Sequence, residues 1–289
     1  MRNIFKNRVT RKLYNGGVAC FGVLLSWLPD RMKVALKPKF RVLKQMDYSP
    51  EKIFLEIESD VEFYDRVRSC QKEPETIEWI HSCFKPGQVY YDIGANVGAY
   101  SLVAAKFLRG QGKVYAFEPG FMNFVELCKN ILINQCQDDI VPFQIALSDR
   151  SIIETFHYNN LTPGGALHAL GQAIDYKNDV FTPVFKQPVL SYRLDDFIKH
   201  FQLPTPNHVK IDVDGNELKI LQGAEETLKN PSLKSLLVEV DEGDEKPGQV
   251  IEFLRQKGLH LHSKHKFVWG GEVGPYSKEF NYIFQRSNG

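Results

Sequence analysis

Short apolar runs alternate with helix-like stretches along most of the chain. The helix-like stretches have apolar residues at helical intervals. Such alternation is typical of parallel strands joined by crossover helices. Gly270-Gly271 and Gly274-Pro275 separate the last two runs and predict an antiparallel closing pair. The pattern therefore predicts one mostly parallel α/β sheet flanked by helices, with seven strands over 89–93, 113–117, 141–147, 209–213, 236–240, 259–269 and 280–284.

A glycine-rich turn connects the run at 89–93 to a predicted helix over 99–108. Gly94 and Gly98 let the backbone turn sharply and approach a ligand closely. Ligands of open α/β sheets bind at the carboxyl ends of strands, where Asp92 stands. A dinucleotide fingerprint would have glycine at the position of Asp92, so the carboxylate favours a small zwitterion with a cationic amine.

A second acidic residue, Glu118, follows the run at 113–117. It lies 26 residues beyond Asp92, about where doubly wound folds place an acid that accepts hydrogen bonds from ribose hydroxyls. An amine-binding aspartate, a glycine turn and a ribose-binding glutamate together predict S-adenosylmethionine as the ligand.

Four motifs, in this order, resemble the FkbM-type methyltransferases. The resemblance covers roughly residues 62–284 and implies the class I methyltransferase fold, S-adenosylmethionine as cofactor and, for most members, a hydroxyl oxygen as acceptor. The family often has glutamate where this chain has Asp214. The motifs are Asp92-Ile-Gly-Ala-Asn96-Val-Gly98-Ala-Tyr-Ser101, Glu118-Pro119, Ala146-Leu-Ser148-Asp149 and Lys210-Ile-Asp212-Val-Asp214-Gly215-Asn-Glu217.

The resemblance also implies the residues that contact the cofactor. The end of the run at 141–147 falls where a class I methyltransferase contacts adenine, and Asp212 would face the methionine part of the cofactor or the acceptor. The expected cofactor-binding residues are Asp92, Gly94, Asn96, Gly98, Glu118, Ala146, Leu147, Ser148 and Asp212.

Three acids crowd the end of the run at 209–213 and are the catalytic candidates. Alternation places Asp212 and Asp214 on the same side of the extended chain, and Glu217 follows in the first turn of the next helix. One of the three is expected to act as general base. For Glu217, the alternative is a charge that stabilises a helix N-terminus. Oxygen ligands for a divalent cation are abundant, but no ligand spacing requires a metal and none is predicted.

The segment 151–192 interrupts the alternation. Strands are predicted at 152–158 and 188–192, and the stretch between them is rich in Gly, Pro and Asn. A long insertion of this kind is commonly a binding loop, so we expect a substrate lid. The groups there most able to meet a polar acceptor are His157, Tyr158, His168 and Tyr176, although a surface or internally bonded role is the alternative for each histidine.

Acids outside the motifs are expected to be mostly solvated. Glu73 and Glu75 stand at the start of a predicted helix over 74–84 that would cover the cofactor side of the sheet. Both are expected to be solvated charges rather than ligand contacts. Glu239 is different, because it lies inside the run at 236–240.

Charge divides the chain unevenly. Residues 1–46 contain 11 Lys and Arg and one acid, a net charge of +10, and the remainder carries −9. The acidic remainder is unlike a nucleic-acid-binding domain. We predict an N-terminal extension over 1–61, with a possible strand near its end, and a methyltransferase domain over 62–289.

An apolar run, 18–28, lies inside the basic extension. It is shorter than the roughly 20 residues that span a bilayer, and no small-x-small cleavage pattern follows it. Peripheral contact of residues 1–46 with an anionic membrane is one interpretation. A helix packed on the domain or on a second subunit, with a solvated basic face, is the other.

Five cysteines without Cys-x-x-Cys spacing favour a reducing cytoplasm, with or without contact at the inner membrane surface. The expected activity is methyl transfer from S-adenosylmethionine to a hydroxyl of a sugar, glycolipid, polysaccharide or natural product. A nicotinamide-dependent oxidoreductase and a non-catalytic, membrane-associated binding protein on the same fold are the alternatives. Asp92 argues against the first, and converging carboxylates argue against the second. The identity of the acceptor and the oligomeric state stay open.

Overall fold

The computed structural model describes residues 8–174, 179–242, 246–266 and 278–286. Its contacts divide the chain into two compact units, Met1–Val42 and Leu43–Gly289. Residues 43–61, which the sequence analysis assigns to the extension, lie in the second unit. They include a short antiparallel pair, β1 (Leu43–Gln45) and β2 (Phe54–Glu56), so the strand expected near residue 55 is present.

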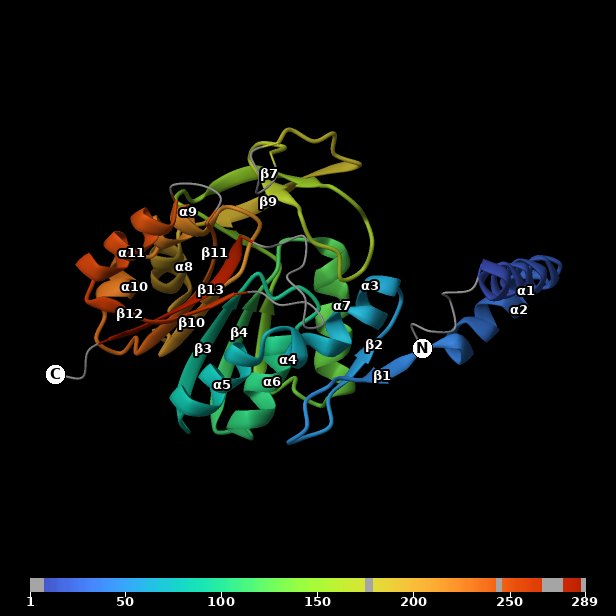
Figure 1. Cartoon of the computed structure of the whole chain (residues 1–289), viewed down its shortest axis with the longest axis horizontal. Helices are drawn as coiled ribbons and strands as arrows, with labels where there is room; N and C mark the ends of the chain where they lie inside the picture. The colour runs from blue at the N-terminus through green and yellow to red at the C-terminus, as the bar shows by residue number, and fades with distance from the viewer. Residues whose placement is uncertain (1–7, 175–178, 243–245, 267–277, 287–289) are drawn as a thin grey trace. The chain divides into compact units, whose positions relative to one another are not determined.

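The main sheet of the second unit has seven strands in the order β12-β13-β11-β10-β3-β4-β5 (Figure 1). The last strand, β13, inserts antiparallel between β11 and β12, and the other neighbouring pairs are parallel. The predicted class I methyltransferase sheet is confirmed. The strands are β3 (Gln88–Ile93), β4 (Gly112–Phe117), β5 (Ile140–Phe143), β10 (His208–Ile211), β11 (Ser235–Asp241), β12 (Leu259–Lys266) and β13 (Glu279–Arg286). The glycines expected to separate the last two strands, at 270–275, lie outside the described residues.

The strand predicted over 141–147 is in fact two strands. β5 forms the edge of the main sheet and pairs with β4. Pro142 lies within β5, where the missing N–H is tolerated because one side of an edge strand has no partner. The chain then leaves the sheet, and β6 (Ala146–Leu147) pairs with β9 (Phe185–Tyr192).

The insertion at 151–192 contributes three strands to a second sheet with the order β6-β9-β7-β8. Its central pair is antiparallel, between β9 and β7 (Ile152–Tyr158), and β8 (Ala169–Leu170) adds to β7. In Figure 1, β7 and β9 lie beyond the ends toward which the arrows of β3 and β4 point. The insertion therefore stands at the carboxyl edge of the main sheet.

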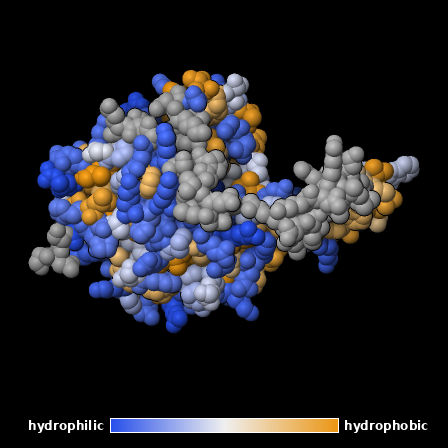
Figure 2. Space-filling model, viewed as in Figure 1, coloured by the Kyte–Doolittle hydropathy of each residue, from blue (hydrophilic) through white to orange (hydrophobic). Residues whose placement is uncertain are grey.

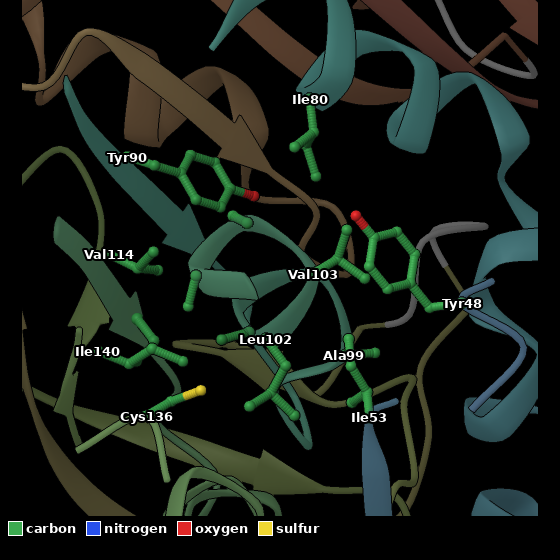
Figure 3. Close-up of a cluster of buried hydrophobic side chains, with 14 of the residues drawn as sticks. Tyr48, Ile53, Ile80, Tyr90, Ala99, Leu102, Val103, Val114, Cys136 and Ile140 are labelled. Atoms are coloured by element: carbon green, nitrogen blue, oxygen red, sulfur yellow. The ribbon is translucent and has the colours of Figure 1, made fainter. Parts of the chain in front are cut away.

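Helices cover both faces of the main sheet, and alternation along β3 directs its side chains into two cores. Tyr90 packs with Leu102 and Val114 in one core (Figure 3), and Tyr91 packs with Phe197 in the other. The helices of this unit are α3 (Asp60–Tyr64), α4 (Ser69–Lys72), α5 (Pro74–Cys83), α6 (Ala99–Leu108), α7 (Phe121–Ile133), α8 (Leu194–Phe201), α9 (Glu217–Gln222), α10 (Glu225–Lys229) and α11 (Lys246–Gln256), with the 3₁₀ turn η2 (Arg66–Arg68) before α4.

The first unit consists of α1 (Arg8–Ser26), α2 (Asp30–Leu36) and the 3₁₀ turn η1 (Lys37–Phe40). The rings of Phe21 and Phe40 meet edge to face with centroids 6.4 Å apart, so η1 folds back on α1. Across the described residues, every helix is too short or too polar to cross a membrane.

Candidate active site

A cavity of about 550 Å³ opens at the carboxyl ends of β3, β4 and β10. This volume lies within the range of small-molecule sites, roughly 300–1,000 Å³. Its walls come from the glycine turn, the ends of β4 and β10, the insertion, and the segment from α3 to α4. The sheet reverses its strand order between β3 and β10, which is where open α/β sheets bind their ligands.

The glycine turn brings the ends of β3 and β10 together. A Cβ atom on Gly94 would lie 1.9 Å from the backbone oxygen of Asp212, and one on Gly98 would lie 2.5 Å from a methyl carbon of Leu127. Both glycines have positive φ, and so does Asn96 at 50°. The Asn96 side chain accepts a hydrogen bond from the next backbone N–H at 2.9 Å, which supports this strained turn. Gly94 and Asn96 line the cavity, whereas Gly98 supports α7 from outside its wall.

Glu118 connects the end of β4 to the glycine turn. Its Oε2 accepts a hydrogen bond from the backbone N–H of Asn96 at 2.9 Å, and Oε1 accepts one from Gly120 at 2.8 Å. Burial raises the pKa of Glu118 to about 7, because these two hydrogen bonds only partly offset desolvation. The residue lines the cavity, as an acid that meets ribose hydroxyls must.

Asp92 lies beneath the turn rather than on the cavity wall. It is 1% exposed and accepts a hydrogen bond from Ser101 Oγ at 2.5 Å. Burial raises its pKa, while the nearby charge of Lys210 acts in the opposite direction. The residues that line the cavity do not include Asp92, so its predicted contact with a ligand amine stays a prediction.

Lys210 is a buried cation, 1% exposed, whose ammonium donates to Asp212 Oδ2. Burial would raise the pKa of Asp212, but the charges of Lys210 and Lys72 and the hydrogen bonds from Lys210 and Glu239 together hold it well below its usual range. Glu239 lines the same part of the cavity and hydrogen-bonds Asp212. Burial, followed by the charge of Asp212, raises the pKa of Glu239 well above its usual range. Asp212 is therefore a carboxylate held between the Lys210 ammonium and the Glu239 carboxyl.

Asp214 lines the cavity and connects β10 to the insertion. The backbone N–H of His168 donates to Asp214 Oδ2 at 2.9 Å. Burial raises the pKa of Asp214 to about 6. Glu217 is not among the residues that line this cavity, and its Oε1 accepts a hydrogen bond from the backbone N–H of Gly215 at 3.1 Å. Of the three catalytic candidates, the structure therefore brings Asp212 and Asp214 to the cavity.

Hydrogen bonds connect the tip of the insertion to the glycine turn, to α7 and to η2. The Gly165 carbonyl accepts from the side-chain amides of Asn96 at 2.9 Å and Asn123 at 3.0 Å. The Gly164 carbonyl accepts two hydrogen bonds from Arg66, at 2.9 and 2.7 Å, and the N–H of Gly164 donates to Asn123 at 3.0 Å. Residues 164–168 line the cavity, and Gly164 and Gly165 are held there by Arg66, Asn96 and Asn123.

Comparison with known proteins decides the family. The family model described as the Methyltransferase FkbM domain matches residues 92–261, more than half of the chain. The chain belongs to the FkbM methyltransferase family. It is similar to the hexuronic acid methyltransferase AglP of Haloferax volcanii, with 24% identity over 67% of this chain and 72% of the relative. The 31-O-demethyl-FK506 methyltransferase FkbM of Streptomyces tacrolimicus is 27% identical over 65% of this chain and 78% of its own length.

As an FkbM-family methyltransferase, the protein uses S-adenosylmethionine as methyl donor, and the nicotinamide alternative falls away. The cavity fits this cofactor. Its described lining contains six acids and two cations, Arg66 and Lys72, which suits a ligand that carries sulfonium and ammonium charges. Glu118 would hold the ribose, and Asp212, beside Gly94, would face the methionine part.

The expected adenine wall is partly present in this FkbM-family cavity. Ala146 and Leu147 line it, together with the apolar side chains of Ile145 and Phe117. Ser148 does not line it, and its hydroxyl donates to the neighbouring Asp149 at 3.0 Å. The contact of Ala146 and Leu147 with adenine stays a prediction.

Only part of the polar set expected in the insertion reaches the cavity. His168 lines it, and burial lowers the pKa of His168 to about 4, which keeps the ring neutral. His157 bonds the Gly171 carbonyl at 3.0 Å, and the hydroxyl of Tyr158 donates to Gln187 at 2.6 Å; neither lines the cavity. Tyr176 lies outside the described residues.

The expectation that Glu73 and Glu75 are solvated is wrong. They are 1% and 7% exposed. Glu73 pairs with Lys72 at 3.3 Å, and Glu75 accepts a hydrogen bond from the side chain of Asn281 at 2.7 Å. These partners explain how the carboxyls tolerate burial.

One part of the cavity lining could not be predicted from the sequence. This wall is formed by Asp65, Arg66, Ser69 and Lys72, in a segment whose sequence carries no motif. Glu279, at the start of β13, also lines the cavity and was not predicted. Among the described residues there is no group of three or more His, Cys, Asp or Glu arranged to hold a metal ion.

Proposed function

We propose that this methyltransferase transfers its methyl group to a hydroxyl oxygen of a sugar, glycolipid, polysaccharide or natural product. The observation that carries the proposal is Asp214, a carboxylate on the wall of the cofactor cavity with a pKa of about 6. Such a group is ionised at neutral pH and is basic enough to take a proton from an alcohol as it reacts.

The two relatives support an oxygen acceptor of this kind. One is named for hexuronic acid and the other for 31-O-demethyl-FK506, whose name specifies an oxygen. The polar wall of Asp65, Arg66, Ser69 and Lys72 supplies groups that hydrogen-bond hydroxyls.

Asp214 is the best placed of the three candidate bases. Asp212 is held by the ammonium of Lys210 and the carboxyl of Glu239, which lowers its basicity. Glu217 is not part of the cavity lining. Asp214 has a raised pKa and faces the cavity, so it would accept the acceptor's proton. General-base assistance of this type contributes about 10²- to 10⁴-fold.

The remaining residues would position the reactants. S-adenosylmethionine supplies an activated methyl group and its own leaving group. The glycine turn and Glu118 would bind and orient it. Residues 164–168, held by Asn96, Asn123 and Arg66, would act as the predicted lid and exclude water.

Calorimetric titration with S-adenosylmethionine and S-adenosylhomocysteine tests the cofactor site first. We expect micromolar binding by the wild type. An acceptor screen then follows methyl transfer by mass spectrometry to neutral sugars, uronic acids, lipid-linked glycans and hydroxylated natural products. The proposal is supported if the wild type methylates an oxygen and Asp214→Asn does not. Methylation of a nitrogen or carbon acceptor instead, or full turnover by Asp214→Asn, would contradict it.

A further inference from the structure

Nine large apolar side chains are exposed among the described residues of the N-terminal unit. Trp27 is 85% exposed and Val34 is 72% exposed. Figure 2 shows hydrophobic residues on the surface of this unit. Contiguous exposed apolar surface marks a site of interaction. The exposed large apolar residues of the unit are Val18, Phe21, Val23, Leu24, Trp27, Met32, Val34, Phe40 and Val42.

Exposed cations come after the apolar run 18–28 and alternate with the exposed apolar side chains of residues 32–42. In residues 30–42 the only acid is Asp30, and it pairs with Lys33 at 3.0 Å. Residues 1–42 contain 10 Lys and Arg and one acid, a net charge of +9. The matching partner is therefore apolar and anionic. The exposed cations of residues 30–42 are Arg31, Lys33, Lys37, Lys39 and Arg41.

The length of the apolar run favours a membrane surface over other apolar and anionic partners. The apolar run 18–28 is 11 residues long, and its helical part ends with α1 at Ser26, so that part is about 13 Å long at 1.5 Å per residue. That length reaches into one leaflet of a hydrocarbon core roughly 30 Å thick and cannot cross it. A second copy of the unit would bring +9 against +9. An anionic bilayer satisfies both the apolar side chains and the cations.

We propose that residues 18–42 form a peripheral membrane anchor. The apolar side chains of 18–28 insert into one leaflet of an anionic bilayer, and the cations from Arg31 to Arg41 face the lipid phosphates. The anchor is independent of the methyl-transfer site, because it uses no residue that lines the cavity.

Flotation of the full chain with lipid vesicles tests this anchor. We expect the protein to float with phosphatidylcholine vesicles that contain phosphatidylglycerol, and to remain in solution with phosphatidylcholine alone. Added salt weakens the interaction. The fluorescence of Trp27 should shift to the blue on binding, and Trp27→Phe should remove that shift while the protein still floats.

A matched pair of variants separates the anchor from general surface hydrophobicity. The triple variant Phe21→Ser, Leu24→Ser and Trp27→Ser should bind at least about tenfold more weakly. The control, Ile153→Ser with Leu190→Ser, changes side chains of the second unit that are 71% and 51% exposed, and it should bind like the wild type. Unchanged titration with S-adenosylhomocysteine shows that each variant is folded.

Three results would overturn the anchor. The first is a wild type that does not float with anionic vesicles. The second is a triple variant that floats as well as the wild type. The third is emission from Trp27 that is already blue-shifted without lipid and insensitive to vesicles, because this would show that protein, either this chain or a second copy, covers the residue.

Discussion

The N-terminal unit exposes apolar side chains that are usually buried, whereas the cavity of the second unit buries a cation that is usually exposed. Trp27 is 85% exposed in the first, whereas Lys210 is 1% exposed in the second. Tryptophan is ordinarily well buried and lysine almost never fully buried unless it is paired. The buried lysine has compensation within the chain, since Asp92 and Asp212 lie beside it. Among the side chains that the structure describes in residues 17–42, none buries Trp27, and this difference distinguishes an internal network from a surface that needs a partner.

The strongest test of this comparison is removal of the buried cation. Lys210→Met leaves Asp92 and Asp212 without their shared counter-charge. Breaking a buried pair in this way costs about 3–5 kcal/mol, so the thermal midpoint should fall by roughly 10 °C. Lys33→Met removes an exposed ion pair in the first unit and should leave the midpoint unchanged. Equal midpoints for both variants would mean that the Lys210 network does not stabilise the fold.

The next effect concerns the carboxylate that joins β4 to the glycine turn. Glu118→Ala removes the acceptor of two backbone hydrogen bonds and of the expected ribose contact. Affinity for S-adenosylhomocysteine should fall at least about 100-fold, because hydrogen bonds to a charged group are the stronger ones. Glu252→Gln, an exposed acid on α11, is the control and should bind normally. Calorimetry measures both, and wild-type affinity in Glu118→Ala would remove this residue from the cofactor site.

The next prediction concerns Asp214, whose negative charge is needed for proton transfer but not for binding of the cofactor. Asp214→Asn should lower kcat about 100-fold and leave cofactor affinity almost unchanged. In the wild type, kcat should rise with pH up to about 6, where Asp214 ionises, and remain level above it. Steady-state kinetics across pH, with an acceptor from the screen, measures this limb. A pH profile with the same limb in Asp214→Asn would assign the base elsewhere.

The last prediction concerns the pH dependence of stability. The pKa values of Glu118 and Glu279 are each raised to about 7, primarily by burial. Their contribution to stability is fully present below the ordinary glutamate pKa and is lost as pH rises through about 7. The lowered pKa of Asp212 acts only at lower pH, below its usual range. Urea midpoints should therefore fall between about pH 5 and pH 8, with a shallower fall in Glu279→Gln.

Sequence patterns predicted the sheet because they are local. The glycine turn, Glu118 and the acids after β10 each stand directly after a strand, so topology alone brings them to one edge. The wall from Asp65 to Lys72 could not be predicted in this way, because its place depends on long-range packing. The burial of Glu75 likewise depends on Asn281, 206 residues away along the chain. A charged residue can therefore be predicted to be exposed only if no polar partner far away in the sequence packs against it.

The attachment of the insertion to the glycine turn has a consequence for turnover. Asn96 belongs to the turn that would hold the cofactor, and its side-chain amide also holds the Gly165 carbonyl. If residues 164–168 act as the proposed lid, opening them would break this contact with the glycine turn, and binding of the cofactor to the turn would favour closing them. We expect a compulsory order in which the donor enters before the acceptor and the spent donor leaves last. The spent donor would then leave only after residues 164–168 open, so each turnover would require one backbone movement at the insertion in addition to the transfer of a methyl group.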